Sequence, residues 1–108
     1  MINGINSREM ILEILLEIEE GEHSHVAIRN ALSKYQFLPK QDRAFITRVC
    51  EGTLEYRIQI DYIINSFSKV TVDKMKPAIR EILRSAVYQL KYMDSVPDSA
   101  VCNEAVKL

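Results

Sequence analysis

The chain has 108 residues and a formal net charge of −1, with 47% hydrophobic and 27% charged residues. This length suits one domain, and the composition is that of a globular protein rather than a disordered or fibrous one. No run of about 18 apolar residues is present, so the sequence predicts no membrane-spanning helix. Because no signal peptide is recognisable at the start, we expect a cytoplasmic protein with a single domain over residues 1–108.

The first predicted helix starts at Asn6 or Ser7, which are good N-cap residues, and ends at Gly21. Apolar residues between these ends have the spacing of one helix face: Ile11, Ile14, Leu15 and Ile18. Glutamates line the opposite face, and residues 1–22 contain six glutamates and one arginine, a net charge of −5. The outer face of this helix therefore repels phosphate.

A second helix is predicted from Ser24 to about Gln36, and Pro39 opens the next one. Helical spacing then continues for more than twenty residues, as far as Phe67, with Gly52 in its middle. This pattern predicts either one long helix or two helices with a kink. A glycine at such a place also allows a neighbouring helix to approach closely.

The segment that follows Pro77 has the most regular apolar pattern of the chain: Ile79, Ile82, Leu83, Ala86, Val87 and Leu90. A last helix, capped by Asp98 or Ser99, has apolar residues up to Leu108. Because no stop signal closes this helix, we expect the chain to be cut within a longer helix, although a natural C-terminus could also end in this way. The predicted fold class is an all-α helical bundle.

The sequence contains no motif of nucleophilic catalysis and no glycine-rich phosphate-binding loop. Its two cysteines, Cys50 and Cys102, lie within apolar helical patterns rather than in a metal-binding or disulfide framework. We interpret both as buried small hydrophobes. For this chain alone we predict no catalytic residue, no metal site and no cofactor.

Basic residues form two clusters that are candidates for RNA binding. One lies along the segment after Pro77 and contains Lys76, Arg80, Arg84, Tyr88 and Lys91. The other lies at the start of the long helix and contains Lys40, Arg43 and Arg48. Arginines beside a tyrosine suit RNA, because guanidinium groups bind phosphate and both planar groups stack on unpaired bases. On pattern alone, the alternative stays open that these residues are solvated or pair with glutamates.

Four motifs occur in the order found in the NusB-like family: Gln41–Phe45 (QDRAF), Glu51–Leu54 (EGTL), Leu83–Leu90 (LRSAVYQL) and Val96–Val106 (VPDSAVCNEAV). The chain resembles that family, and within it most closely the N-terminal RNA-binding domain of the RsmB (Sun) methyltransferases. The other setting of the family is the stand-alone transcription antitermination factor. Gln89, where the antitermination factors usually have a glutamate, and the acidic start of the chain favour the methyltransferase setting.

The resemblance implies an RNA-binding domain that recruits small-subunit ribosomal RNA for a separate catalytic domain. That domain would bind S-adenosylmethionine and methylate cytosine C5. Family members have one more helix after the Asn-Glu-Ala-Val motif, so we expect a bundle without its last helix, an apolar groove in its place, and a homodimer that closes this groove. The alternatives are an antitermination factor and a helical protein–protein interaction module. Arg43 and Arg84 fall within matched motifs, and we expect Asn103 and Glu104 to brace neighbouring turns.

Overall fold

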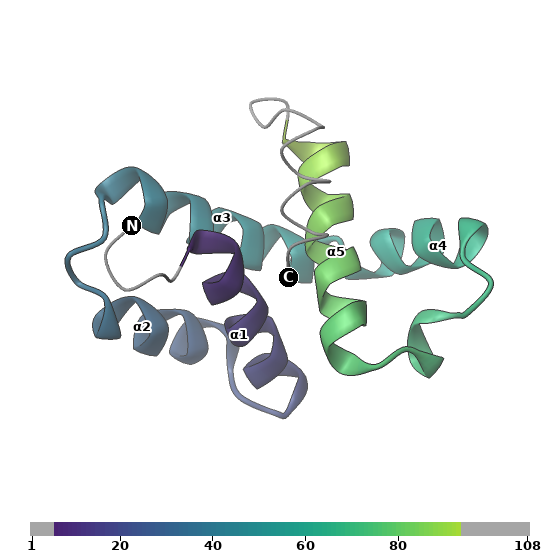
Figure 1. The fold of residues 1–108 in the computed structure, drawn as a ribbon, viewed down its shortest axis with the longest axis horizontal. Helices are drawn as coiled ribbons and strands as arrows, with labels where there is room; N and C mark the ends of the chain where they lie inside the picture. The colour runs from purple at the N-terminus through teal and green to yellow at the C-terminus, as the bar shows by residue number, and fades with distance from the viewer. Residues whose placement is uncertain (1–5, 94–108) are drawn as a thin grey trace.

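The computed structural model describes residues 6–93, which contain helices and no strand. The elements are α1 (Ser7–Glu19), α2 (Ser24–Lys34), α3 (Lys40–Glu55), α4 (Arg57–Phe67), the short 3-10 helix η1 (Val72–Lys74) and α5 (Pro77–Tyr92). Helices α1, α2 and α3 lie on one side of the molecule and α4 on the other, with α5 between them (Figure 1). The all-α prediction is confirmed. The predicted last helix and Cys102 lie outside the described residues.

Both ends of α1 form as the sequence predicts. The Asn6 side-chain oxygen accepts a hydrogen bond from the Glu9 backbone N–H at 2.9 Å, and the Asn6 amide donates to the Glu9 carboxylate at 3.2 Å. The first bond satisfies a backbone donor that the helix itself leaves free, and the second joins the two side chains, an arrangement similar to a capping box. At the other end Gly21 has a φ of +114°, and its N–H donates to the Ile18 carbonyl at 3.0 Å. Glycine adopts this left-handed conformation without a steric cost, so the helix ends there.

The core lies where α1 packs on α2 and α3, and it extends to α4. Its fully buried apolar side chains are Met10, Ile11, Ile14, Leu15, Ala27, Ile46, Val49, Cys50, Ile60 and Ile64. The predicted burial of Cys50 is confirmed. Burial raises the pKa of its thiol well above the ordinary value, which keeps the sulfur protonated and unreactive. Within residues 6–93, none of the helices is both long and apolar enough to cross a bilayer.

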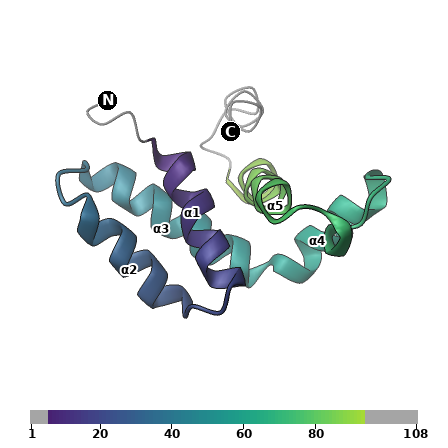
Figure 2. The same ribbon diagram turned by 60° about the horizontal axis from the view of Figure 1, so that its bottom comes forward.

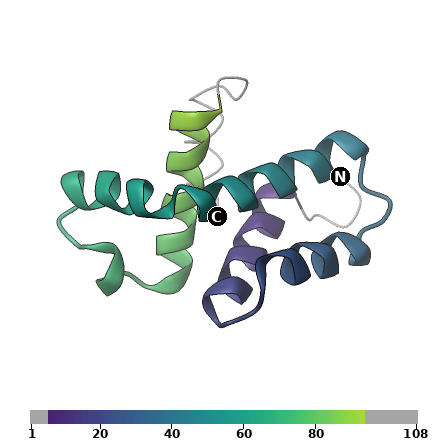
Figure 3. The ribbon, with the colours of Figure 1, turned by 180° about the vertical axis from the view of Figure 1, so that it is seen from behind.

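The long helical segment forms two helices, and the break lies at Tyr56, where φ is −102° and ψ is 18°. Helices α3 and α4 run nearly in line across the view of Figure 3. Gly52 lies inside α3, where a Cβ atom would overlap the ring of Tyr88 from α5. The close approach of a neighbouring helix is therefore confirmed, whereas the change of direction comes four residues after the glycine.

Helix α5 differs most from the prediction. Its buried residues are mostly polar: Glu81, Arg84, Ser85, Tyr88 and Gln89. The predicted apolar stripe lies on the opposite side, and its end members Ile79 and Leu90 are 50% and 43% exposed. At about 100° per residue the two faces are separated by roughly half a turn. Figure 2 looks almost along α5 and shows it between α1 and α4. The polar face is turned toward these two helices, since Arg84 donates to Glu19 on α1 and to Asp61 on α4.

Candidate nucleic-acid interface

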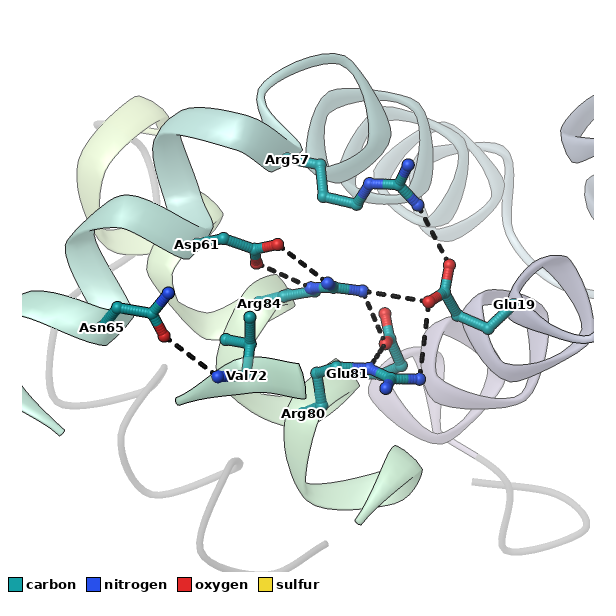
Figure 4. Close-up of polar contacts among 8 residues, drawn as sticks. All are labelled: Glu19, Arg57, Asp61, Asn65, Val72, Arg80, Glu81 and Arg84. Carbon is teal, nitrogen blue, oxygen red and sulfur yellow. Dashed lines mark hydrogen bonds and ion pairs between the residues drawn. The ribbon is translucent and has the colours of Figure 1, made fainter. Parts of the chain in front are cut away.

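Arg84 lies at the centre of a charged network that joins three helices (Figure 4). Its Nε and Nη2 atoms donate to the two carboxylate oxygens of Asp61 on α4, each at 2.8 Å. Its Nη1 atom donates to Glu81 on the same helix at 2.9 Å and to Glu19 on α1 at 3.3 Å. The bidentate geometry and the 8% exposure of the Arg84 side chain show that its guanidinium group is bound by protein carboxylates.

Two further arginines complete the network and balance its charge. Arg80 pairs with Glu81 at 2.8 Å and with Glu19 at 3.4 Å, and Arg57 pairs with Glu19 at 3.0 Å. Three guanidinium groups thus face three carboxylates. Burial alone would lower the pKa of Arg84, but its hydrogen bonds to Asp61 and the surrounding negative charges raise it. Burial raises the pKa of Glu81, and the neighbouring arginines offset only part of that effect.

These contacts correct the predicted basic face on α5. Arg80 and Arg84 point into the network, and Tyr88 is 6% exposed, with its ring against Gly52. Lys76 and Lys91 remain exposed, but they lie at opposite ends of the helix. The prediction is wrong about this surface because two of the three partner carboxylates, those of Glu19 on α1 and Asp61 on α4, lie far away in the sequence, and the third, that of Glu81, lies on α5 itself.

Arg43 also has a structural role. Its Nη1 atom donates to the backbone carbonyls of Leu32 and Tyr35 at 3.1 and 3.2 Å. These carbonyls lie at the C-terminal end of α2, where a helix lacks internal donors and favours a positive charge. Arg43 therefore fixes the α2–α3 connection, and its predicted role as a free RNA contact is corrected accordingly.

The predicted cations Lys40 and Arg48 border a groove along α3 that reaches Tyr88 of α5, here called the α3 groove. Its volume is about 560 Å³, and its lining residues are Lys40, Arg43, Ala44, Thr47, Arg48, Glu51, Gly52, Glu55 and Tyr88. Lys40 and Arg48 are exposed, and neither forms an ion pair within residues 6–93. These two side chains offer positive charge to an anionic ligand.

A second groove, here called the α1–α3 groove, adjoins the first and shares Ala44 and Arg48 with it. Its volume is about 460 Å³, and it is lined by Ser7, Arg8, Gln41, Asp42, Ala44, Phe45, Arg48 and Met93. The guanidinium carbon of Arg8 lies 5.3 Å from the centre of the Phe45 ring, and Arg8 Nη2 donates to Gln89 at 3.1 Å.

Sequence reasoning missed Arg8 as a candidate site residue because it precedes a row of glutamates. No local pattern pairs Arg8 with Gln89, which lies 81 positions away in the sequence, and this neutral partner leaves the charge of Arg8 uncompensated. Arg8 thereby adds a third cation beside Lys40 and Arg48, at a place where α1, α3 and α5 meet.

Comparison with known proteins places the chain among helical proteins of one family. The sequence profile of the NusB family matches residues 5–108. The chain belongs to the NusB family. It is 31% identical over 101 residues to the probable ribosomal RNA small subunit methyltransferase B of Bacillus subtilis, covering 94% of this chain and 22% of that protein. The corresponding protein of Synechocystis is 33% identical over 105 residues, covering 96% of this chain and 23% of that protein.

The transcription antitermination protein NusB of Acetivibrio thermocellus is 31% identical over 104 residues, covering 94% of this chain and 71% of that protein. The chain therefore spans less than a quarter of the length of the methyltransferases that it matches, and most of the length of this antitermination protein.

The motifs behind the family resemblance have clear structural roles within the described residues. Arg43 binds the end of α2, Gly52 accommodates Tyr88, and Arg84 joins α1, α4 and α5. These three motif residues thus hold the helices together. Lys40 and Arg48 are exposed and lie outside the four motifs, whereas Arg8 contacts the motif residues Gln89 and Phe45.

Proposed function

We propose that this chain is an RNA-binding domain that recruits small-subunit ribosomal RNA for a methyltransferase domain elsewhere in a longer protein. The observation that carries the proposal is the pair of adjoining grooves on α3, where Lys40, Arg48 and Arg8 offer positive charge without carboxylate partners among residues 6–93. Phosphate contacts from such side chains supply most of the affinity of a protein for RNA or DNA. The net charge of −1 is compatible with this role because the positive charge is local.

The setting in a methyltransferase is supported by the two relatives of that name, which match nearly the whole chain. It is also supported by Gln89, a neutral residue that accepts a hydrogen bond from Arg8 where a glutamate would form an ion pair with it. In this setting the chain binds and positions ribosomal RNA in the cytoplasm. S-adenosylmethionine and the methyl transfer to cytosine C5 belong to the catalytic domain outside these 108 residues.

The proposal is tested by RNA binding at several salt concentrations, measured by fluorescence anisotropy with labelled fragments of small-subunit ribosomal RNA. The variant Lys40→Glu/Arg48→Glu is compared with Lys69→Glu/Lys74→Glu, which changes the charge equally on exposed residues of the connection between α4 and α5. Each lost phosphate contact lowers the slope of log K against log salt by about 0.7 to 0.9. We expect weaker binding and a smaller slope for the first variant only. Equal effects of both variants, or no binding by the natural chain at low salt, would refute the proposal.

A stand-alone antitermination factor is the second candidate, because the chain spans 71% of the NusB protein of Acetivibrio thermocellus. Competition between a ribosomal RNA hairpin and an unstructured RNA of equal length separates the two candidates. A preference for the hairpin supports recruitment to ribosomal RNA, and a preference for the unstructured strand supports antitermination.

A third candidate is a protein–protein interaction module that uses the partly exposed apolar stripe of α5, where Ile79 and Leu90 lie. It predicts no RNA binding even at low salt. Sedimentation of the same samples measures whether the homodimer expected to close the groove of the missing last helix forms.

A further inference from the structure

The outer face of α4 carries two large apolar side chains that nothing within residues 6–93 covers. Ile58 is 87% exposed and Tyr62 is 77% exposed, the two highest values among the large hydrophobic residues of this part of the chain. The two residues are four positions apart, so their side chains lie next to each other on one side of the helix. Adjoining apolar side chains that face water mark a surface that binds a partner.

Almost no charge accompanies this apolar pair. Residues 58–67 contain a single charged residue, Asp61, in a chain of which 27% is charged. Both carboxylate oxygens of Asp61 accept hydrogen bonds from Arg84, so this charge is turned toward α5. Depletion of charge around an exposed aromatic residue is typical of the core of a protein–protein interface. Because RNA phosphates require cations, this face fits a protein better than RNA.

The apolar pair lies on the same side of the molecule as the α3 groove. Helices α3 and α4 run nearly in line (Figure 3), and the buried residues Thr53 and Ile60 are seven positions apart, so the helical phase continues through the break between the two helices. At about 100° per residue, the groove residue Glu55 and the apolar pair therefore share one side. At about 1.5 Å per residue, Tyr62 lies about 20 Å along the axis from Arg48.

The size of the apolar pair indicates what kind of protein covers it. At about 200 Å² for a large side chain, the exposed fractions of Ile58 and Tyr62 amount to roughly 300 Å² of surface. With an equal area on the partner, the total buried surface would be about 600 Å², where interfaces between domains of one chain begin. Stable complexes between separate chains bury about 1,200–2,000 Å². The pair therefore fits a domain of the same chain better than a second copy, because a covalent link gives such a domain a high effective concentration.

We propose that Ile58 and Tyr62 bind the methyltransferase domain of the longer protein and hold it beside the α3 groove. The inference rests on the proposed function and adds to it the surface through which the RNA-binding domain positions the catalytic one. In the two methyltransferases that match this chain, the matched region is 22% and 23% of the protein, which leaves room for a large partner domain in the same polypeptide. RNA bound at Lys40 and Arg48 then lies at the edge of the catalytic domain.

The first test identifies what covers α4 in the full-length protein that the gene encodes. Tyr62 is replaced by the photo-cross-linking residue p-benzoylphenylalanine, and mass spectrometry locates the cross-link in the presence of small-subunit ribosomal RNA. We expect a cross-link to the methyltransferase domain of the same molecule. The matched control carries the same residue in place of Phe37, which is 55% exposed on the connection between α2 and α3, and should give no such cross-link. A cross-link from position 62 to a second copy, to RNA or to the remainder of the helical bundle would overturn the inference.

The second test measures the strength of docking by amide hydrogen exchange of α4 in the full-length protein. The variant Ile58→Ser/Tyr62→Ser is compared with Phe37→Ser/Val70→Ser, which removes two apolar side chains that are 55% and 47% exposed elsewhere. Circular dichroism of the 108-residue chain confirms that both variants are folded. We expect exchange at least about tenfold faster for the first variant only, which corresponds to a loss of about 1.4 kcal/mol or more. The RNA affinity of the 108-residue chain should be unchanged in both variants.

The possible results separate the inference from the proposed function. If the cross-link or the difference in exchange is absent while the 108-residue chain binds ribosomal RNA, the docking surface is refuted and the RNA-binding role stands. If Ile58→Ser/Tyr62→Ser weakens RNA binding by the 108-residue chain, the face contacts RNA instead, and the inference is also overturned. If the gene encodes no methyltransferase domain, the proposed function fails and the inference fails with it.

Discussion

Replacing Arg84 by methionine tests whether this residue serves the fold or the RNA. Methionine keeps much of the side-chain length but removes four hydrogen bonds, which leaves Asp61, Glu81 and Glu19 without their shared partner. Removal of one partner from a buried charge pair costs about 3–5 kcal/mol. Because the side chains of Asp61 and Glu19 are 22% and 23% exposed, water compensates part of the loss. We expect a decrease of about 3 kcal/mol in the free energy of unfolding.

Urea denaturation followed by circular dichroism at the helix band measures this decrease. For a small protein, about 3 kcal/mol corresponds to a shift of roughly 1–3 M in the midpoint. The matched control is Arg57→Met, which removes one ion pair from a side chain that is 46% exposed, and its expected cost is less than about 1 kcal/mol. Arg84→Met should leave the salt dependence of RNA binding unchanged under conditions where it is folded. The reasoning is refuted if Arg84→Met costs no more than Arg57→Met, or if it abolishes RNA binding without loss of stability.

Three further predictions concern single residues. Gly52→Ala should lower the free energy of unfolding by about 1–2 kcal/mol in urea denaturation, because overlap with Tyr88 outweighs the better helix propensity of alanine. In a Tyr88→Ala background the same change should raise the free energy of unfolding by about 1 kcal/mol, and a decrease in that background would contradict the packing of Tyr88 on Gly52. Gln89→Glu should weaken RNA binding and reduce the salt dependence of that binding, because a carboxylate at this position would pair with the positive charge of Arg8. Unchanged binding in an anisotropy titration would show that Arg8 does not contact the RNA. When Cys102 is replaced by serine, Cys50 should not react with a thiol reagent in the folded protein, even at a pH above the ordinary pKa of cysteine, because burial raises the pKa of its thiol. Cys50 should react once urea unfolds the chain, and rapid reaction in the folded protein would show that Cys50 is not buried.

The elements of this fold are encoded in short stretches of sequence. The cap at Asn6, the end of α1 at Gly21 and the start of α5 at Pro77 depend on residues within a few positions of each other, so the pattern identifies them directly. The boundary at Tyr56 escaped prediction because helical spacing continues through it, and only packing on the other helices sets the direction of α4. The resemblance to the NusB family rested on the same local motifs, and the family match confirms it.

The candidate interface depended on the tertiary structure to a much greater extent. Lys40 and Arg48 are exposed, as predicted. Arg80 and Arg84 instead form ion pairs with carboxylates on other helices, so they are not available to bind RNA. Arg84 meets Glu19 across 65 positions of sequence and Asp61 across 23. A helical pattern shows which side chains share a face, but not what that face meets. The sequence alone therefore determined the helices and the family. The packing of α1 and α4 against α5 decided which cations form no ion pair within residues 6–93, because charge pairing depends on distance in space rather than along the chain.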